Sequence, residues 1–239
     1  MNKVSGTVSL ANNVNVNNTL TMTQGNIDCG ASTLTLGTSI LSTGTLTYTA
    51  GTIIGNCKRW KNSVAGSLLF PVGTTTYYRP VLITFNVVSG GTLNVNFVSS
   101  NPGTSGLPYL DDDGITTIQN QYTEGYWDLT AADILSSTDY NMECTGEGFT
   151  SYTIGTSTRL MYRSTSGNPW VVNGTHTAAS GSTARRNNVN GLSAQFGFGK
   201  PACSSFLTTA ITTLTPDPVC INQLNVDYSV NVSNPSNTY

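Results

Sequence analysis

Alternation of apolar and polar residues at every second position is the feature of this sequence that most restricts its fold. In residues 1–56, Val14, Val16, Leu20 and Met22 share one parity, with Asn and Thr between them. Successive side chains of a β-strand point to opposite faces, whereas a helix repeats every three to four residues. The alternation therefore predicts strands that bury one face.

Three similar phrases in this segment, TLTMT, TLTLG and TLTYT, begin at Thr19, Thr33 and Thr45. A glycine follows each phrase within a few residues, at Gly25, Gly37 and Gly51. Short strands at a near-constant interval with glycine at the corners are typical of a solenoid, although a hairpin meander produces similar alternation. We favour a short solenoid-like stack for residues 1–56 and keep the meander as the alternative.

Beyond Cys57 the apolar runs are more varied and richer in aromatic residues. Turn signals rich in Gly, Pro and Asn separate expected strands near 67–72, 79–88, 92–98, 124–130, 138–145, 157–163, 169–173 and 189–198. Many short strands with such punctuation predict an antiparallel β-sandwich, jelly-roll-like, over residues 57–199. The one helical candidate lies around Ala131–Leu135, where one turn at most is expected.

The last part of the chain changes character again. Pro201, Pro216 and Pro218 bracket a Ser/Thr-rich run, which predicts a linker over residues 200–218. Residues 219–239 then alternate through Leu224, Val226, Tyr228, Val230 and Val232. Since one or two strands cannot bury a core alone, this segment is interpreted as the start of a further, truncated domain.

Low charge excludes several classes of protein. Only 9% of residues are charged, against roughly 25% in ordinary domains, and the net charge is -2. A nucleic-acid-binding surface needs a basic excess, so none is expected. There is no run of about 18 apolar residues, so no membrane insertion is expected. No apolar leader follows Met1, and the composition looks extracellular, so we expect a piece of a longer exported protein.

The cysteines fit export better than metal binding. No two of the five have the spacing of a zinc or redox motif, and the sequence has one histidine, His176. In an exported protein we expect at least one disulfide, and the sequence-local options are Cys29 with Cys57 and Cys203 with Cys220. Buried free thiols, Cys144 included, are the alternative, and the odd count leaves at least one cysteine without a partner in the chain.

Two groups of residues suggest catalysis or metal binding. Asp111, Asp112 and Asp113 form the densest carboxylate cluster, but the spacing of a calcium loop is absent, so a turn is the simpler interpretation. His176 has no accompanying nucleophile elbow or zinc motif, so a structural role is expected. We therefore predict no catalytic residue, no metal and no cofactor.

Other patterns are compatible with ligand binding. Trp60, Trp127 and Trp170 are candidates to stack on sugar rings, although core positions are commoner. The Thr-x-Thr phrases suggest a hydroxyl array of the ice-binding kind, which three unequal repeats argue against. Glu124, Asp128 and Glu143 are candidates for a glycosidase acid pair, but ion pairs with Arg59, Arg79 or Arg163 are the simpler expectation. The ligand-binding residues stay unknown.

The closing strands of the expected sandwich resemble a family. The run from Arg159 to Gly199 is similar to the end of a β-sandwich module in large cell-surface and secreted proteins of Bacteroidota. The phrases KRW at 58–60, FPVG at 70–73, YRP at 78–80 and EGYW at 124–127 also fit. The matching residues of the closing strands are Arg163, Trp170, Gly174, Thr175, His176, Arg185, Phe196 and Gly199.

This resemblance implies type IX secretion, a place at the cell surface, and a role in adhesion or gliding motility. It also implies that residues 219–239 begin an immunoglobulin-like, PKD-like domain. We therefore predict a structural and adhesive segment of a large exported protein, without catalysis. Its expected partners are surface glycans or other cell-surface proteins, together with the type IX secretion machinery. The alternative is a carbohydrate-binding module of an exported multidomain enzyme.

Overall fold

The computed structural model describes residues 1–202, and every regular element in that range is a β-strand. The prediction of an all-β fold is confirmed. No helix in residues 1–202 is long and apolar enough to cross a membrane. The strands are β1 (Asn2–Ser9), β2 (Val14–Val16), β3 (Thr19–Met22), β4 (Gln24–Leu36), β5 (Thr45–Tyr48), β6 (Ile53–Lys61), β7 (Gly66–Phe70), β8 (Val81–Val87), β9 (Gly91–Val98), β10 (Tyr109–Leu110), β11 (Thr117–Gln121), β12 (Tyr126–Ala132), β13 (Asp139–Thr145), β14 (Arg159–Arg163), β15 (Thr175–Ser180), β16 (Thr183–Val189) and β17 (Ala194–Pro201).

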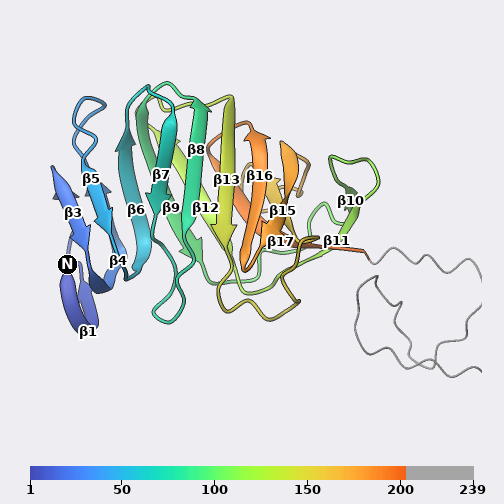
Figure 1. The fold of residues 1–239 in the computed structure, drawn as a ribbon, viewed down its shortest axis with the longest axis horizontal. Helices are drawn as coiled ribbons and strands as arrows, with labels where there is room; N and C mark the ends of the chain where they lie inside the picture. The colour runs from blue at the N-terminus through green and yellow to red at the C-terminus, as the bar shows by residue number, and fades with distance from the viewer. Residues whose placement is uncertain (203–239) are drawn as a thin grey trace, which may run out of the picture. The chain divides into compact units, whose positions relative to one another are not determined.

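Two sheets hold most of these strands and face each other across the core (Figure 1). The larger has ten strands and contains the path β1-β4-β6-β9-β12-β17-β11-β10, with β2 bonded to β4 and β14 bonded to β17. The smaller runs β15-β16-β13-β8-β7. Val95 and Trp127 from the larger sheet share one buried cluster with Ile83 and Met142 from the smaller. The alternating residues predicted from the sequence are thus what fills the space between the layers.

The N-terminal strands pair in parallel. β4 lies between β1 and β6 and is parallel to both. β3 and β5 form a separate parallel pair in which Thr19 is opposite Thr45 and Thr21 is opposite Thr47. The phrase that begins at Thr33 lies in β4, which belongs to the ten-stranded sheet. Alternate phrases therefore stack on each other, rather than all three in one ladder.

Glycines make this stacking possible at the corners. Gly25 and Gly51 have φ values of 85° and 102°, in the left-handed region that side chains rarely adopt. A Cβ atom on Gly51 would lie 2.1 Å from the carbonyl oxygen of Gly25. The two corners are in direct backbone contact, so a residue with a side chain does not fit at Gly51.

Most of the remaining strands pair antiparallel, and most lie close to the predicted ranges. Antiparallel pairing joins β6 to β9, β9 to β12 and β12 to β17 in the larger sheet. The strand expected at 169–173 is wrong, because that segment forms only an isolated bridge between Val171 and Tyr162. The hairpin of β15 and β16 was not predicted, because no strand was expected between residues 173 and 189.

The helical candidate around Ala131–Leu135 does not form a helix. β12 continues to Ala132, and a turn follows in which Asp133 and Ile134 have φ values of 52° and 63°. Two consecutive residues in the left-handed region cannot continue a right-handed helix. The turn is instead fixed by the bond from the hydroxyl of Thr92 to the Asp133 carboxylate, at 2.7 Å.

Residues 1–201 form one compact unit. The predicted boundary between residues 56 and 57 falls inside β6, which pairs with β4 on one edge and with β9 on the other. Tyr48 of β5 also stacks on Tyr78, with ring centroids 5.4 Å apart. Lys200 and Pro201, expected in the linker, belong to β17. The rest of the linker from 203 and the segment 219–239 lie outside the described residues, and the predicted domain limits stay predictions.

Candidate functional site

Charged residues from distant parts of the sequence meet at one place. Three carboxylates in the turn between β10 and β11 meet side chains of β14, β15 and β16. We call this the charge cluster, and its members are Asp111, Asp112, Asp113, Arg159, His176 and Arg186. It brings together the aspartates and the histidine that the sequence singled out, with two arginines that it did not.

Asp111 is the centre of the charge cluster. Its side chain is fully buried, and it accepts hydrogen bonds from Nε of Arg159 at 2.7 Å and from Nη2 of Arg186. Burial by itself raises the pKa of Asp111, but the hydrogen bond and charge of Arg186 and the charge of Arg159 outweigh it, so the pKa is lowered. The carboxylate is therefore ionised and neutralised by arginine on both oxygens.

Asp112 and Asp113 occupy the outer side of the same turn. Asp112 Oδ1 lies 3.3 Å from Nη2 of Arg186, and Asp113 Oδ2 lies 3.4 Å from Nη2 of Arg159. Asp113 also accepts hydrogen bonds from the hydroxyl and backbone N–H of Thr116, which hold its pKa below the usual value. The carboxylates therefore serve arginines and the turn. In residues 1–202 no group of three His, Cys, Asp or Glu side chains is arranged to hold a metal ion.

His176 is held by both its backbone and its ring. Its N–H donates to the two oxygens of Asp112, each at 3.1 Å. Its Nε2 lies 2.8 Å from Nη1 of Arg159, and since arginine only donates, Nε2 accepts. Burial and then the charge of Arg159 lower the pKa of His176, so the ring is neutral with its proton on Nδ1. The basic nitrogen of His176 is thus already used as an acceptor.

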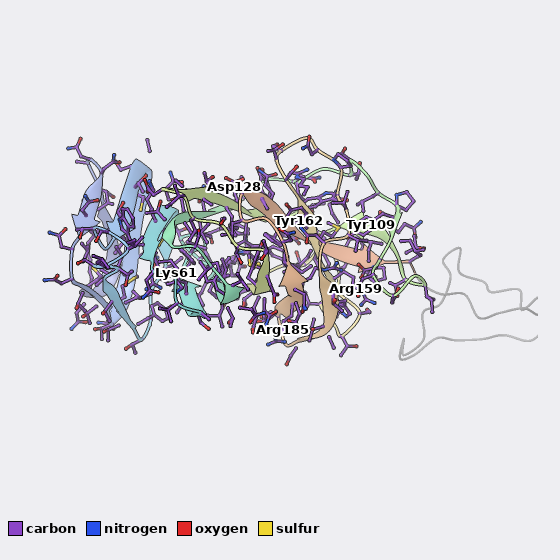
Figure 2. All side chains as sticks on the ribbon, turned by 90° about the horizontal axis from the view of Figure 1, so that it is seen from above. Lys61, Tyr109, Asp128, Arg159, Tyr162 and Arg185 are labelled. Carbon is purple, nitrogen blue, oxygen red and sulfur yellow. The ribbon has the colours of Figure 1, made fainter. Side chains whose placement is uncertain are left out.

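Tyr109 of β10 lies beside the same charges, close to Arg159 (Figure 2). Burial raises the pKa of its hydroxyl, so the side chain stays protonated. Neither Tyr109 nor Arg186 was predicted as a site residue. Tyr109 lies in a two-residue strand, and Arg186 occupies an inward position of its strand, where an apolar residue is expected.

The candidate glycosidase carboxylates are engaged by separate partners. Glu124 accepts from the backbone N–H of Thr150 at 2.6 Å. Asp128 accepts from the amide of Gln195 at 2.7 Å, and Glu143 forms an ion pair with Arg185, its Oε2 lying 3.1 Å from Nε. Asp128 and Glu143 lie on strands of different sheets. No pair of these acids faces a shared opening in the described residues.

The prediction that Arg59, Arg79 or Arg163 forms an ion pair with those acids is wrong. None of the three forms an ion pair among residues 1–202. Their guanidinium groups lie over aromatic rings and donate to backbone carbonyls, which are the acceptors that their buried positions offer. Arg59 donates to the carbonyl of Leu69, Arg79 to that of Glu147 and Arg163 to that of Pro102.

Two of the three tryptophans are core residues. Trp127 and Trp170 are 0% and 1% exposed, and their ring N–H groups donate to the carbonyls of Arg79 and Gly103. Neither has a face open to a sugar. Trp60 is half-buried beside a cavity of about 290 Å³. Of the threonine phrases, β3 and β5 expose a two-strand array of Thr19, Thr21, Thr45 and Thr47.

The described cysteines are buried free thiols. Cys29 and Cys57 lie on adjacent strands, and no disulfide joins them. Burial raises the pKa of Cys29 to about 11 and that of Cys57 to about 12, and it raises the pKa of Cys144 well above the usual value. The Cys203–Cys220 option lies outside the described residues.

A polar groove lies beside the loop that follows β13. We call it the Arg79 groove, and its volume is about 600 Å³. Its lining is dominated by hydroxyl, amide and charged side chains: Thr74, Thr75, Thr76, Tyr77, Arg79, Ser99, Ser100, Asn101, Thr123 and Glu124, with Gly148. The loops before β8, after β9 and before β12 bring these residues together.

Arg79 is the most firmly placed residue of the groove. It is 3% exposed, and its guanidinium lies 4.6 Å from the ring of Phe97, 4.8 Å from that of Phe149 and 5.0 Å from that of Tyr77. Its Nε donates to the Glu147 carbonyl at 2.8 Å. The terminal nitrogens make no hydrogen bond within residues 1–202, so they remain as donors at the groove.

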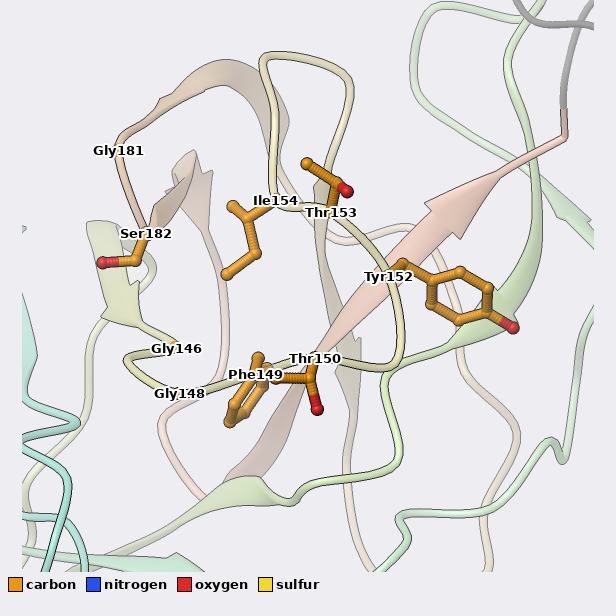
Figure 3. Close-up of a pocket in the computed structure, with 9 residues that line it drawn as sticks. All are labelled: Gly146, Gly148, Phe149, Thr150, Tyr152, Thr153, Ile154, Gly181 and Ser182. Atoms are coloured by element: carbon orange, nitrogen blue, oxygen red, sulfur yellow. The ribbon is translucent and has the colours of Figure 1, made fainter. Parts of the chain in front are cut away.

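A second hollow of about 460 Å³ adjoins the same loop (Figure 3). In Figure 3, Ile154 and Phe149 contribute its apolar side, while the ring of Tyr152 points away. No charged side chain lines it: the lining is Gly146, Gly148, Phe149, Thr150, Tyr152, Thr153, Ile154, Gly181 and Ser182.

Comparison with known proteins adds no relative to this geometry. No family model, no curated protein and no solved structure matches the chain.

Proposed function

We propose that the chain is a structural and adhesive segment of a large exported cell-surface protein and performs no catalysis of its own. The observation that carries the proposal is the charge cluster. The groups best suited to acid–base work, Asp111 and His176, are bonded to Arg159 and Arg186, and these contacts link three strands and a turn. Catalytic groups need a free lone pair or proton facing a substrate, and these are committed to the fold.

The arrangement of strands supports an architectural role. Parallel strands with glycine corners are typical of solenoid repeats, in which each repeat contacts its neighbours, and we propose that residues 1–56 are a short solenoid. We propose that the two facing sheets after it are a jelly-roll-like sandwich, and that an immunoglobulin-like domain begins at residue 219. Location at the cell surface, type IX secretion and a part in gliding motility rest on the resemblance of residues 159–199 to Bacteroidota surface modules.

The test is cell attachment. A strain whose copy of the protein lacks residues 1–202 should attach to surfaces less than the parent strain, and the intact gene should restore attachment. A gene carrying His176→Gln should restore it equally, because glutamine can still accept from Arg159 and has no titratable nitrogen. An antibody against residues 1–202 should label intact cells.

Two results would count against the proposal. Attachment that is unchanged by the deletion would remove the adhesive role. A hydrolytic activity of the purified chain that His176→Gln abolishes, at unchanged thermal stability, would show that the chain is an enzyme.

A further inference from the structure

We propose that the Arg79 groove binds a neutral saccharide. This inference deepens the proposed function, because it names the ligand class through which an adhesive segment would act. It rests on four observations: the volume of the groove, the fixed position of Arg79, the balance of charge, and the free hydroxyl groups along the rim.

The groove has the size and lining of a small-molecule site. Its volume of about 600 Å³ falls within the range of roughly 300–1,000 Å³ typical of such sites. Most such sites are largely apolar, whereas this one is lined mainly by hydroxyl and amide groups. A ligand that fits it must carry many donors and acceptors of its own, as a polyhydroxylated molecule does.

Arg79 is preorganised to donate. Three aromatic rings hold the guanidinium, and the bond from Nε to the Glu147 carbonyl fixes its rotation. Its terminal nitrogens have no partner in residues 1–202, although the residue is 3% exposed. A planar pair of N–H donors suits two adjacent oxygen atoms, such as neighbouring sugar hydroxyls. Because the side chain is already ordered, binding costs little additional entropy.

Charge balance favours a neutral ligand over an anion. Glu124 lines the same groove, and its charge acts on Arg79. Burial raises the pKa of Glu124, but hydrogen bonds from Thr150 and Ser151 outweigh it and leave the pKa lowered, so this carboxylate is ionised. The charge of Glu124 offsets that of Arg79, and the charge of Glu147 acts on Arg79 in the same direction. A phosphate or carboxylate ligand would therefore meet no net positive charge.

The rim supplies the remaining contacts. The hydroxyls of Thr75, Thr76, Ser99 and Ser100 are exposed and make no hydrogen bond in the described part of the chain. Each is able to donate and accept, which matches the dual character of sugar hydroxyls. Tyr77, which is 38% exposed, adds an aromatic ring to the lining.

Gly148 sets the position of that tyrosine. A Cβ atom on Gly148 would lie 2.4 Å from the Tyr77 ring, so only glycine allows the ring to lie against this loop. The φ of Gly148 is 71°, which also favours glycine. The wall of the groove is thus built by close contacts rather than left by loosely packed loops.

The experiment is a titration of the whole, isotope-labelled chain with neutral trisaccharides at millimolar concentration, followed by backbone amide NMR. The probes are maltotriose, cellotriose, mannotriose and xylotriose. At least one should shift amides of residues 74–77, 99–101 and 123–124. Ser100→Trp places a large ring in the groove and should weaken binding about tenfold or more, which corresponds to about 1.4 kcal/mol. Ser166→Trp, at an exposed position away from the groove, is the matched control and should bind normally.

Arg79→Gln should also abolish binding, but a loss of folding would give the same result, so Ser100→Trp decides. The inference is overturned if no trisaccharide shifts these amides, if the shifts fall elsewhere, or if Ser100→Trp binds like the parent chain. Stronger binding of inorganic phosphate or a trigalacturonate than of every neutral probe would overturn the ligand class. Cell attachment by the Ser100→Trp strain separates the two proposals: attachment without sugar binding keeps the adhesive role and removes this site.

Discussion

Replacing Asp111 by alanine tests whether the charge cluster holds the fold together. The side chain of Asp111 is fully buried, and its removal leaves two buried guanidinium groups, those of Arg159 and Arg186, without their main counter-charge. Breaking a buried ion pair by removing one partner costs about 3–5 kcal/mol. In a unit of this size, 1 kcal/mol corresponds to roughly 2–4 °C, so the melting temperature should fall by about 6–20 °C.

The exposed pair of Glu143 and Arg185 supplies the control. The two side chains are 36% and 28% exposed, and exposed pairs contribute about 0–1 kcal/mol. Urea unfolding followed by tryptophan fluorescence should therefore separate Asp111→Ala clearly from Glu143→Ala. If both variants lose the same small amount of stability, the charge cluster does not hold the fold and the reasoning is refuted.

Three further predictions follow from the same structure. The pKa of Asp111 is lowered on folding, so its contribution to the free energy of unfolding is complete above the unfolded value of about 3.9. That contribution is lost as pH falls through the folded value. The urea midpoints of the parent chain and of Asp111→Ala should therefore converge below about pH 4. Cys57 is buried and has a pKa of about 12, so it should resist a thiol reagent at pH 8 until denaturant is added. Peptide mapping by mass spectrometry measures the labelling. Rapid labelling of the native chain would contradict the burial of Cys57. In thermal melts, Gly51→Ala should lower the melting temperature clearly more than Gly167→Ala. Both glycines have positive φ, but only a Cβ atom at Gly51 would meet a neighbouring carbonyl. Equal losses of stability would exclude the corner contact as the cause.

Periodicity predicted the strands where each buried position is apolar. β8, β9 and β13 lie within two residues of their expected limits because their inward residues are Val, Ile, Leu, Phe, Tyr, Met or Cys. The β15–β16 hairpin was missed because Arg186 occupies an inward position with 0% exposure and reads as polar. Alternation also carries no information on strand direction, so the parallel pairing of β3 with β5 had to come from the structure.

The candidate site was only partly accessible from the sequence. Asp111 and His176 stood out as rare residue types in a chain with few charges, and the structure brings them together. Their partners Arg159 and Arg186 lie 48 and 75 positions from Asp111, a pairing that depends on which strands become neighbours. The Arg79 groove was not predicted as a site, although Arg79 lies in the phrase YRP and Glu124 in the phrase EGYW. Its hydroxyl residues are the commonest polar types of the chain and come from separate loops, so no pattern joins them.

The position of β17 has a consequence for the order in which the chain acquires its structure. β17 ends at Pro201, yet it lies inside the ten-stranded sheet and bonds to β11, β12 and β14. It also contributes Phe196 and Phe198 to the core, both 0% exposed. During synthesis the earlier strands emerge first, but the centre of this sheet is missing until β17 has left the ribosome. The unit should therefore stay open until then, which gives a chaperone time to engage the chain before it closes.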